Sequence, residues 1–291
     1  MNNVLRNDLL LLSQFGFSDK LLTILYENRI HYLDSIFDHN SSFYKTNISF
    51  FTKKDIELSS DYQKLLDFYK PFLDKMREYK NKGIRILYRY DKTFPDGVLP
   101  KNSLRMFLFV YGNLPLIYSE KKVAIVGSRN ISNQTKILTS ETVDAYIKDG
   151  YVTISGLAKG VDTIVHQETI NKNGNTIAVL ATPFEKIYPK ENEKLFYDII
   201  QSGGLILTLH GPFSHTHKSH FLDRNEIVAE LCNEIVMTEA SIKSGTLNTI
   251  RNASLLNKSI FYIPSLIESE VEKYIIELGA QNISYRKQGG K

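Results

Sequence analysis

The sequence predicts an α/β protein in which a small all-α domain precedes a parallel sheet that carries helices on both faces. Apolar residues recur at helical spacing from Leu5 to about Tyr79. From Lys122 onward, short β-branched runs alternate with amphipathic stretches, a pattern typical of βαβ units with parallel strands. Hydrophobic residues make up 42% of the 291-residue chain, which is enough to form a sizeable core.

The first region, residues 1–80, is predicted to be a small helical domain. Its helical spacing is carried by Leu9, Leu10, Leu12, Leu21, Leu22, Ile24, Leu25, Leu65, Leu66, Phe68 and Phe72. Residues 83–120 change character, because GIRILYRY and RMFLFVYGN are strand candidates on either side of a turn-rich segment. This segment leads into the next domain.

The second region, residues 81–265, is predicted to hold the parallel sheet. Its strand candidates are 123–127, 151–155, 176–181, 205–209, 234–238 and 259–264. The intervening helices are expected at about 135–149, 159–172, 192–201, 223–231 and 246–257. Asp223 and Glu226 have the spacing of a capping box, which predicts that the fourth of these helices begins at Asp223. Residues 266–291 contain one short amphipathic helix, ESEVEKYIIEL, and a polar tail.

Charge and cysteine content exclude several classes of protein. With 36 Lys and Arg against 32 Asp and Glu, the net charge of +4 does not by itself indicate a nucleic-acid partner. The single cysteine, Cys232, excludes disulfides within the chain and a cysteine-rich zinc site, so a reducing, cytoplasmic setting is expected. No run approaches the ~18 apolar residues of a membrane helix, so no membrane association is expected.

Four loops at the predicted carboxyl end of the sheet combine small or hydroxyl residues with a cation. Ligands of parallel sheets bind at this edge, where helix N-termini expose free N–H groups. Close approach of a phosphate requires small residues, hydrogen-bond donors and positive charge. The loops contain Gly127-Ser128-Arg129-Asn130, the segment from Ser155 to Asp162, the segment HGPFSHTHKSHFLDRN, and Lys243-Ser244-Gly245-Thr246.

Several of these residues have structural interpretations that remain open. Arg129 could form an ion pair with Glu141 or Asp144 on the following helix instead of binding a phosphate. Lys159 could be a solvated residue of a first helical turn. Asp162 and His166 share one helix face, and a polar pair that fixes a loop is favoured there over an acid–base pair.

The sequence shows binding groups without an evident catalytic nucleophile. His210, His215, His217 and His220 could surround zinc, but the loop has no cysteine, and a metal site is disfavoured. Glu239 follows a strand as a catalytic carboxylate would, yet no serine–histidine–acid or paired-carboxylate arrangement surrounds it. A nicotinamide dehydrogenase is disfavoured because VAIVGSRN lacks the G-x-G-x-x-G motif.

Seven segments together resemble the DprA/Smf family over roughly residues 83–280. The segments are YDKTFPDGVLP, VAIVGSR, ISGLAKGVDTIVHQETI, NTIAVLATPFEKIYPKEN, HFLDRNEIVAEL, TEASIKSGTLNT and FYIPS. The resemblance implies an extended Rossmann-like domain behind a small helical, SAM-like domain over residues 1–80, with no enzymatic activity and no cofactor. It also implies that a homodimer protects incoming single-stranded DNA and loads a RecA-type recombinase during natural transformation.

The resemblance also implies which residues bind the strand. They are Gly127, Ser128, Arg129, Ser155, Gly156, Lys159, Arg224, Asn225, Lys243, Ser244 and Gly245. One position departs from the family pattern, because Glu226 stands where an arginine is usual, which predicts weakened or relocated DNA binding. Many family members also have a C-terminal winged-helix domain, for which the residues after Pro264 are expected to be too few.

Two other functions stay open at this point. The fold is similar to that of LOG phosphoribohydrolases, which bind nucleotides or cleave nucleosides, and Glu239 would then be the candidate catalytic residue. A pure adaptor that recruits a protein partner, with DNA binding lost, is the second alternative, and the substitution at Glu226 keeps it open.

Overall fold

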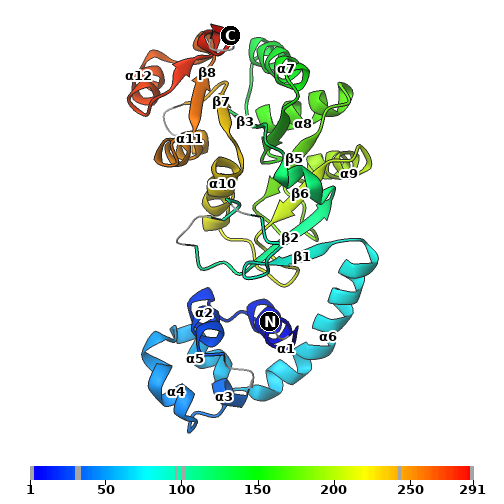
Figure 1. Cartoon of the computed structure of the whole chain (residues 1–291), viewed down its shortest axis with the longest axis vertical. Helices are drawn as coiled ribbons and strands as arrows, with labels where there is room; N and C mark the ends of the chain where they lie inside the picture. The colour runs from blue at the N-terminus through cyan, green and yellow to red at the C-terminus, as the bar shows by residue number, and fades with distance from the viewer. Residues whose placement is uncertain (1–2, 30–33, 96, 100–102, 242–243, 289–291) are drawn as a thin grey trace. The chain divides into compact units, whose positions relative to one another are not determined.

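The computed structural model describes residues 3–29, 34–95, 97–99, 103–241 and 244–288. Two compact units are present (Figure 1). The first comprises Met1–Phe94, Asn102–Phe109 and His210–His215. The second comprises Pro95–Lys101, Val110–Leu209 and Thr216–Lys291.

Helices dominate the first unit, as the spacing of its leucines predicts. They are α1 (Asn3–Phe15), α2 (Asp19–Glu27), α3 (Asp34–Phe37), α4 (Ser42–Asn47), α5 (Lys53–Ser59) and α6 (Tyr62–Asn81), followed by strand β1 (Arg85–Tyr88). A capping box formed by Thr52 and Asp55 begins α5, and Ser18 caps α2. Leu9, Leu12, Leu21, Leu22, Leu25 and Leu65 are buried at the centre. The helical prediction is confirmed.

The strands form a sheet in the order β1-β2-β6-β5-β4-β3-β7-β8-β9. After β1, their bounds are β2 (Phe107–Gly112), β3 (Lys122–Val126), β4 (Val152–Ser155), β5 (Thr176–Leu180), β6 (Leu205–Thr208), β7 (Glu234–Met237), β8 (Ser259–Tyr262) and β9 (Gln281–Asn282). Neighbouring strands from β6 to β9 run parallel, with Ala124 of β3 opposite Ile154 and Ile235. The parallel sheet predicted from the sequence is confirmed.

The strand order reverses between β3 and β7. From β3 to β6, successive strands add on one side, and β7 then pairs with β3 on its other side. Such a reversal leaves a crevice beyond the carboxyl ends of the two strands, where ligands of this fold class bind. The crevice lies beside Val126 of β3 and Met237 of β7, which are opposite each other in the register.

Two groups of helices cover the sheet of the second unit. Helices α7 (Asn133–Lys148), α8 (Val161–Asn171) and α9 (Glu193–Gln201) pack in sequence against one another. Helices α10 (Ser219–Leu231) and α11 (Gly245–Leu255) pack together on the other side of the strands, as Figure 1 shows. A last helix, α12 (Ser269–Glu277), matches the amphipathic segment predicted after Pro264.

The predicted start of α10 is wrong. The helix begins at Ser219, so Asp223 lies in its second turn and cannot form the expected capping box with Glu226. Burial explains the earlier start. His220, Arg224, Val228 and Leu231 are all buried and follow one another at helical spacing, so the inward face of the helix extends a turn before Asp223.

Candidate functional site

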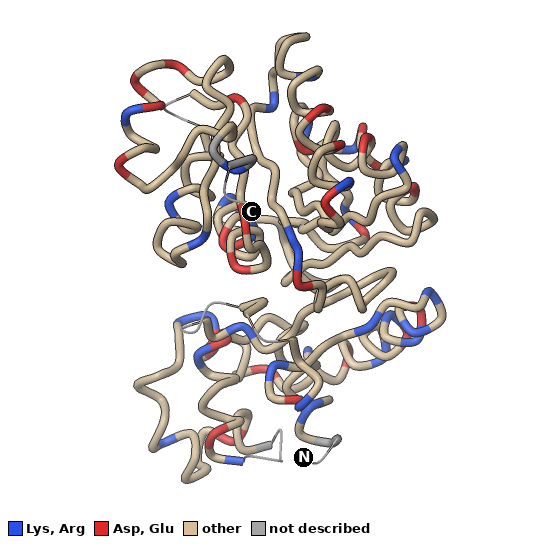
Figure 2. The backbone as a smooth tube through the Cα atoms, turned by 45° about the horizontal axis from the view of Figure 1, so that its top comes forward, with Lys and Arg blue, Asp and Glu red and all other residues tan. Residues whose placement is uncertain are grey.

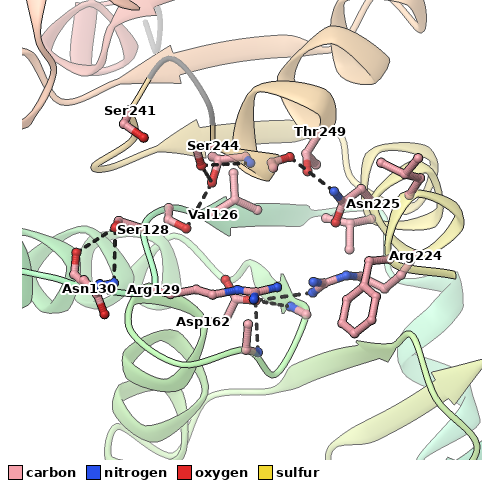
Figure 3. Close-up of a pocket in the computed structure, with 18 residues that line it drawn as sticks. Val126, Ser128, Arg129, Asn130, Asp162, Arg224, Asn225, Ser241, Ser244 and Thr249 are labelled. Atoms are coloured by element: carbon pink, nitrogen blue, oxygen red, sulfur yellow. Dashed lines mark hydrogen bonds and ion pairs between the residues drawn. The ribbon is translucent and has the colours of Figure 1, made fainter. Parts of the chain in front are cut away.

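A pocket of about 430 Å³ opens at the carboxyl end of β3, beside the reversal of strand order. It is lined by the turns after β3, β4 and β7 and by the start of α8, α10 and α11 (Figure 3). Among the predicted site residues, it brings together Gly127, Ser128, Arg129, Gly156, Arg224, Asn225, Ser244 and Gly245. Ser155 and Lys159 do not line it, and Lys243 lies outside the described residues.

The turn after β3 is tight because neighbouring side chains leave no room at Gly127. A Cβ there would lie 2.3 Å from Thr238 Oγ1, so only glycine fits. Ser128 Oγ accepts the Asn130 N–H at 3.2 Å and donates to the Asn130 carbonyl at 2.6 Å. The hydroxyl of Ser128 thus folds the turn and directs the next side chain, Arg129.

Arg129 is exposed and forms no ion pair with any residue that the structure describes. The alternative ion pair with the helix is absent, and Asp144 binds Lys148 and Lys172 instead. The guanidinium carbon of Arg129 lies 5.9 Å from the ring centroid of Phe221, a cation–π distance. Arg129 therefore brings a free positive charge to the pocket.

Arg224 also lines the pocket, but its charge is compensated. Its Nη1 donates to Asp162 Oδ2 at 3.3 Å, and both side chains are 9% exposed. The same carboxylate oxygen accepts the N–H groups of Gly156 and Ala158, each at 3.2 Å. A Cβ on Gly156 would lie 0.9 Å from Arg224 Nη1, so glycine makes room for the guanidinium. Asp162 thus fixes this loop together with Arg224, and not in the pair with His166 that the sequence favoured.

The two guanidinium groups converge on one space. Figure 3 shows Arg129 and Arg224 reaching into the pocket from opposite sides. Burial lowers the pKa of Arg224, Asp162 opposes this effect, and the charge of Arg129 lowers the pKa further. Because Asp162 compensates Arg224, the positive charge that an incoming anion would meet is that of Arg129. The pocket is therefore suited to bind a phosphate.

His166 does not pair with Asp162, although the two residues share a helix. Its Nδ1 lies 2.7 Å from Thr176 Oγ1, and the ring is completely buried. Burial lowers the pKa of the imidazole to about 4, an effect that Asp162 partly opposes. His166 is therefore neutral near pH 7 and has no access to the pocket.

The N-terminus of α11 forms another wall of the pocket. Ser244 caps the helix by accepting the Thr246 N–H at 3.1 Å, and Thr246 Oγ1 donates to the carbonyl of Gly127 at 3.0 Å. Asn225 Nδ2 donates to the Gly245 carbonyl at 3.2 Å, which joins α10 to α11. No described atom lies within 4 Å of a Cβ built on Gly245, so the start of the helix is open to a ligand. Its dipole favours an anion there.

The structure places Ser155 and Lys159 elsewhere. Ser155 is buried, and its hydroxyl donates to the carbonyl of Ile125 at 2.9 Å, within the sheet. Lys159 lines a neighbouring pocket and forms an exposed ion pair with Glu191 at 2.6 Å. Glu226, the departure from the family pattern, is exposed and does not line either pocket.

Phe221 is a site residue that sequence reasoning missed. It lines both pockets, contacts Arg129, and lies three residues before Arg224 on α10. Aromatic side chains near cations commonly stack on the bases of single strands, so Phe221, three residues from Arg224, was the available sequence signal. The signal was readable in HFLDRN once the helix was known to start before Asp223.

Neither the histidines at 210–220 nor Glu239 is among the described residues that line the pocket. Among the residues that the structure describes, no group of three His, Cys, Asp or Glu side chains could hold a metal ion, so the histidines at 210–220 form no such group. The side chain of Glu239 accepts a hydrogen bond from Thr135 and is absent from the pocket lining. No described helix has both the length and the apolar character needed to cross a bilayer.

Comparison with known proteins identifies relatives of the chain. DNA processing protein DprA of Streptococcus pneumoniae is 38% identical over 177 residues, which are 61% of this chain and 62% of that protein. DNA processing protein DprA of Bacillus subtilis is 29% identical over 213 residues, 73% of this chain and 71% of that protein. The chain thus spans about two thirds of the length of these relatives.

Solved structures of DNA processing protein A are also similar to this chain. The X-ray structure of DNA processing protein A from Streptococcus pneumoniae superposes with a TM-score of 0.68 at 26% identity, covering 97% of this chain and 94% of that one. DNA processing protein A from Helicobacter pylori, described for its single-stranded DNA binding mode, gives a TM-score of 0.61 at 30% identity and covers 69% and 90%. Residues 85–288 match the family model directly, so the chain belongs to the DNA recombination-mediator protein A family.

Proposed function

We propose that the chain binds single-stranded DNA in the pocket at the end of β3. The observation that carries the proposal is Arg129, an exposed guanidinium that pairs with no carboxylate among the described residues and lies beside the ring of Phe221 and the open start of α11. A phosphate would bind between Arg129 and the backbone N–H groups of this wall, and a base would stack on Phe221. Stacking and backbone contacts tolerate any sequence, so binding without base readout is expected.

We also propose a biological role for the chain, and the support for it comes from the family to which the chain belongs. The related Helicobacter pylori protein is described as binding single-stranded DNA, which supports the same ligand for this chain. We further propose that the protein acts as a homodimer in the cytoplasm, protects single strands entering during natural transformation, and loads a RecA-type recombinase on them.

A catalytic role is less well supported, and we propose that the protein is not an enzyme. A nucleoside-cleaving protein needs a free carboxylate in its pocket. The acid among the described lining residues is Asp162, whose Oδ2 accepts hydrogen bonds from Gly156, Ala158 and Arg224. Incubation with nucleotides is expected to release no free base. Release that is lost in Glu239→Gln would overturn this part of the proposal.

Replacing Arg129 tests the binding site. Arg129→Ala is expected to weaken binding of a fluorescent oligothymidylate roughly 10- to 100-fold at low salt, because it removes a charged hydrogen-bond donor. Arg251→Ala is the matched control. Arg251 is exposed on α11, bonds to Tyr274, and does not line the pocket. Equal losses in the two variants would show that general charge, and not this site, holds the strand.

A further inference from the structure

A second, smaller pocket adjoins the first and shares its wall. Both pockets are lined by Arg129, Gly156, Ala158, Phe221 and Arg224. The second is completed by Lys159, Ala181, Thr182, Tyr188 and Pro189, from the loops after β4 and β5. The second pocket has a volume of only about 40 Å³, so a base would lie across its opening on the rings that line it, and not inside it.

Tyr188 presents an open aromatic surface in the second pocket. Its side chain is 52% exposed, although the ring is large and apolar. The ring centroids of Tyr188 and Phe221 are 5.7 Å apart, with the planes at 80°. The two rings form a corner, so a base stacked on one ring would lie with its edge against the other. Such stacking is a common means of holding single strands without sequence readout.

Lys159 supplies a cation to the same pocket and forms an ion pair there with Glu191. Lys159 Nζ lies 2.6 Å from Glu191 Oε1, and the two side chains are 55% and 65% exposed. An ion pair as exposed as this contributes little free energy, so a phosphate can displace the carboxylate. The hydrogen bond from Lys159 lowers the pKa of Glu191, which keeps the carboxylate ionised and able to compete with a phosphate.

We propose that this pocket is a second nucleotide subsite, in which a base stacks on Tyr188 and its phosphate replaces the carboxylate of Glu191 on Lys159. The proposal rests on the proposed binding of single-stranded DNA in the first pocket. It adds a path for the strand across Phe221 and assigns Glu191 as a competing anion that the strand must displace.

Two substitutions at Tyr188 separate stacking from packing. Tyr188→Leu keeps an apolar side chain but removes the aromatic face, and it is expected to weaken binding of oligothymidylate about 5- to 100-fold. Tyr188→Phe keeps the ring and is expected to bind as the wild type does. Thermal unfolding of each variant checks that the fold is retained. Unchanged binding in Tyr188→Leu, or equal losses in both variants, would overturn the stacking role.

Glu191→Gln tests the exchange on Lys159. It frees the ammonium group and is expected to strengthen binding by up to about 5-fold. Asp198→Asn is the matched control, because it removes the same charge from an exposed ion pair with Lys194 at 2.7 Å that lines neither pocket. Adding Lys159→Gln to Glu191→Gln should abolish the gain and reduce the slope of log K against log salt by about 0.7. An equal gain in Asp198→Asn would overturn the exchange.

The two levels of the proposal fail differently. If the wild type binds no oligothymidylate at low salt, the proposed function fails, and the subsite fails with it. The second subsite alone is wrong if the wild type binds and Arg129→Ala weakens binding, but Tyr188→Leu binds as the wild type does and Glu191→Gln behaves as Asp198→Asn does.

Discussion

Arg224 contributes to the pocket mainly by holding it together. Its guanidinium is buried against Asp162, whose carboxylate also fixes the N–H groups of Gly156 and Ala158. Removing one partner of a buried ion pair leaves the other charge without compensation. The resulting loss of stability is larger than the net stability that the intact pair contributes. A loss of DNA binding in a variant of Arg224 would therefore include a loss of structure, whereas the exposed Arg129 reports on the ligand alone.

A stability measurement tests this assignment. Arg224→Ala is expected to lower the free energy of unfolding by about 3–5 kcal/mol, because the Asp162 carboxylate stays buried without its partner. Adding Asp162→Asn should recover part of the loss by removing that charge. Chemical denaturation of the wild type and the two variants measures both effects. A loss below about 1 kcal/mol in Arg224→Ala would mean that solvent reaches the pair.

His166 makes stability depend on pH. Burial depresses the pKa of its imidazole to about 4, while in the unfolded chain the pKa stays near 6.5. The unfolded state therefore binds more protons between these values, and stability falls as the pH falls from about 6.5 to 4. Between pH 7.5 and pH 5, this one residue is expected to account for a loss of about 2 kcal/mol.

The variant His166→Gln separates this effect from other titrations. Glutamine retains polar atoms that can bond to Thr176, the partner of His166 Nδ1, but it does not titrate. The free energy of unfolding of His166→Gln should therefore change less than that of the wild type between the two pH values. Identical pH dependence in both proteins would show that His166 is not buried in its neutral form.

Among the elements of the fold, the buried strands were the most predictable from sequence. Runs such as VAIV and TIAVL are apolar on both faces because helices cover both sides of the sheet, and β3 and β5 form at these positions. The first turn of α10 was missed because it begins with the polar residues Ser219 and His220, and the burial of His220 depends on tertiary contacts. Strand β9 has two polar residues and gives no pattern at all.

The candidate site was predictable at the level of loops but not of side-chain direction. Gly127 and Gly156 lie where close approach excludes a Cβ, as glycines after strands suggest. Ser155 resembles a phosphate ligand in sequence, yet it is the last residue of β4, and its hydroxyl bonds within the sheet. The direction of a side chain at a strand end depends on register, which the sequence does not give.

A 3-10 helix, Ile283–Gln288, follows β9 and is fixed by Arg286. The guanidinium donates to Glu234 at 2.9 Å and to Asp149 at 2.8 Å, and its carbon lies 3.9 Å from the ring centroid of Tyr146. Hydrogen bonds to both acids raise the pKa of Arg286 against the effect of burial. These contacts join the segment after α12 to β7 and to the end of α7.

Arg286→Ala is expected to lower the free energy of unfolding by about 1–3 kcal/mol, because Glu234 loses a charged donor at a half-buried site. Arg286→Lys keeps the charge but loses the planar stacking on Tyr146, and it should recover only part of the loss. Hydrogen exchange should show faster opening of residues 281–288 in Arg286→Ala. Unchanged exchange would mean that backbone pairing with β8 suffices to hold the segment.

At the scale of the whole molecule, charge does not identify a binding face. The net charge is +4, and Figure 2 shows basic and acidic residues interspersed along both units. A strand must therefore be attracted by a local site with few cations, and electrostatic steering by the whole protein is weak. This predicts a small number of phosphate contacts and a correspondingly shallow dependence on salt.

Comparing the binding of single-stranded DNA, duplex DNA and mononucleotides, each at two salt concentrations, tests whether the pocket at the end of β3 holds a single strand. We expect the wild type to bind the single strand more tightly than the other two ligands. Salt should weaken this binding with a slope of about 0.7 per phosphate contacted, and Arg129→Ala should reduce the slope. Absence of single-strand binding at low salt, or equal binding of mononucleotides, would contradict the proposed binding of a single strand in this pocket.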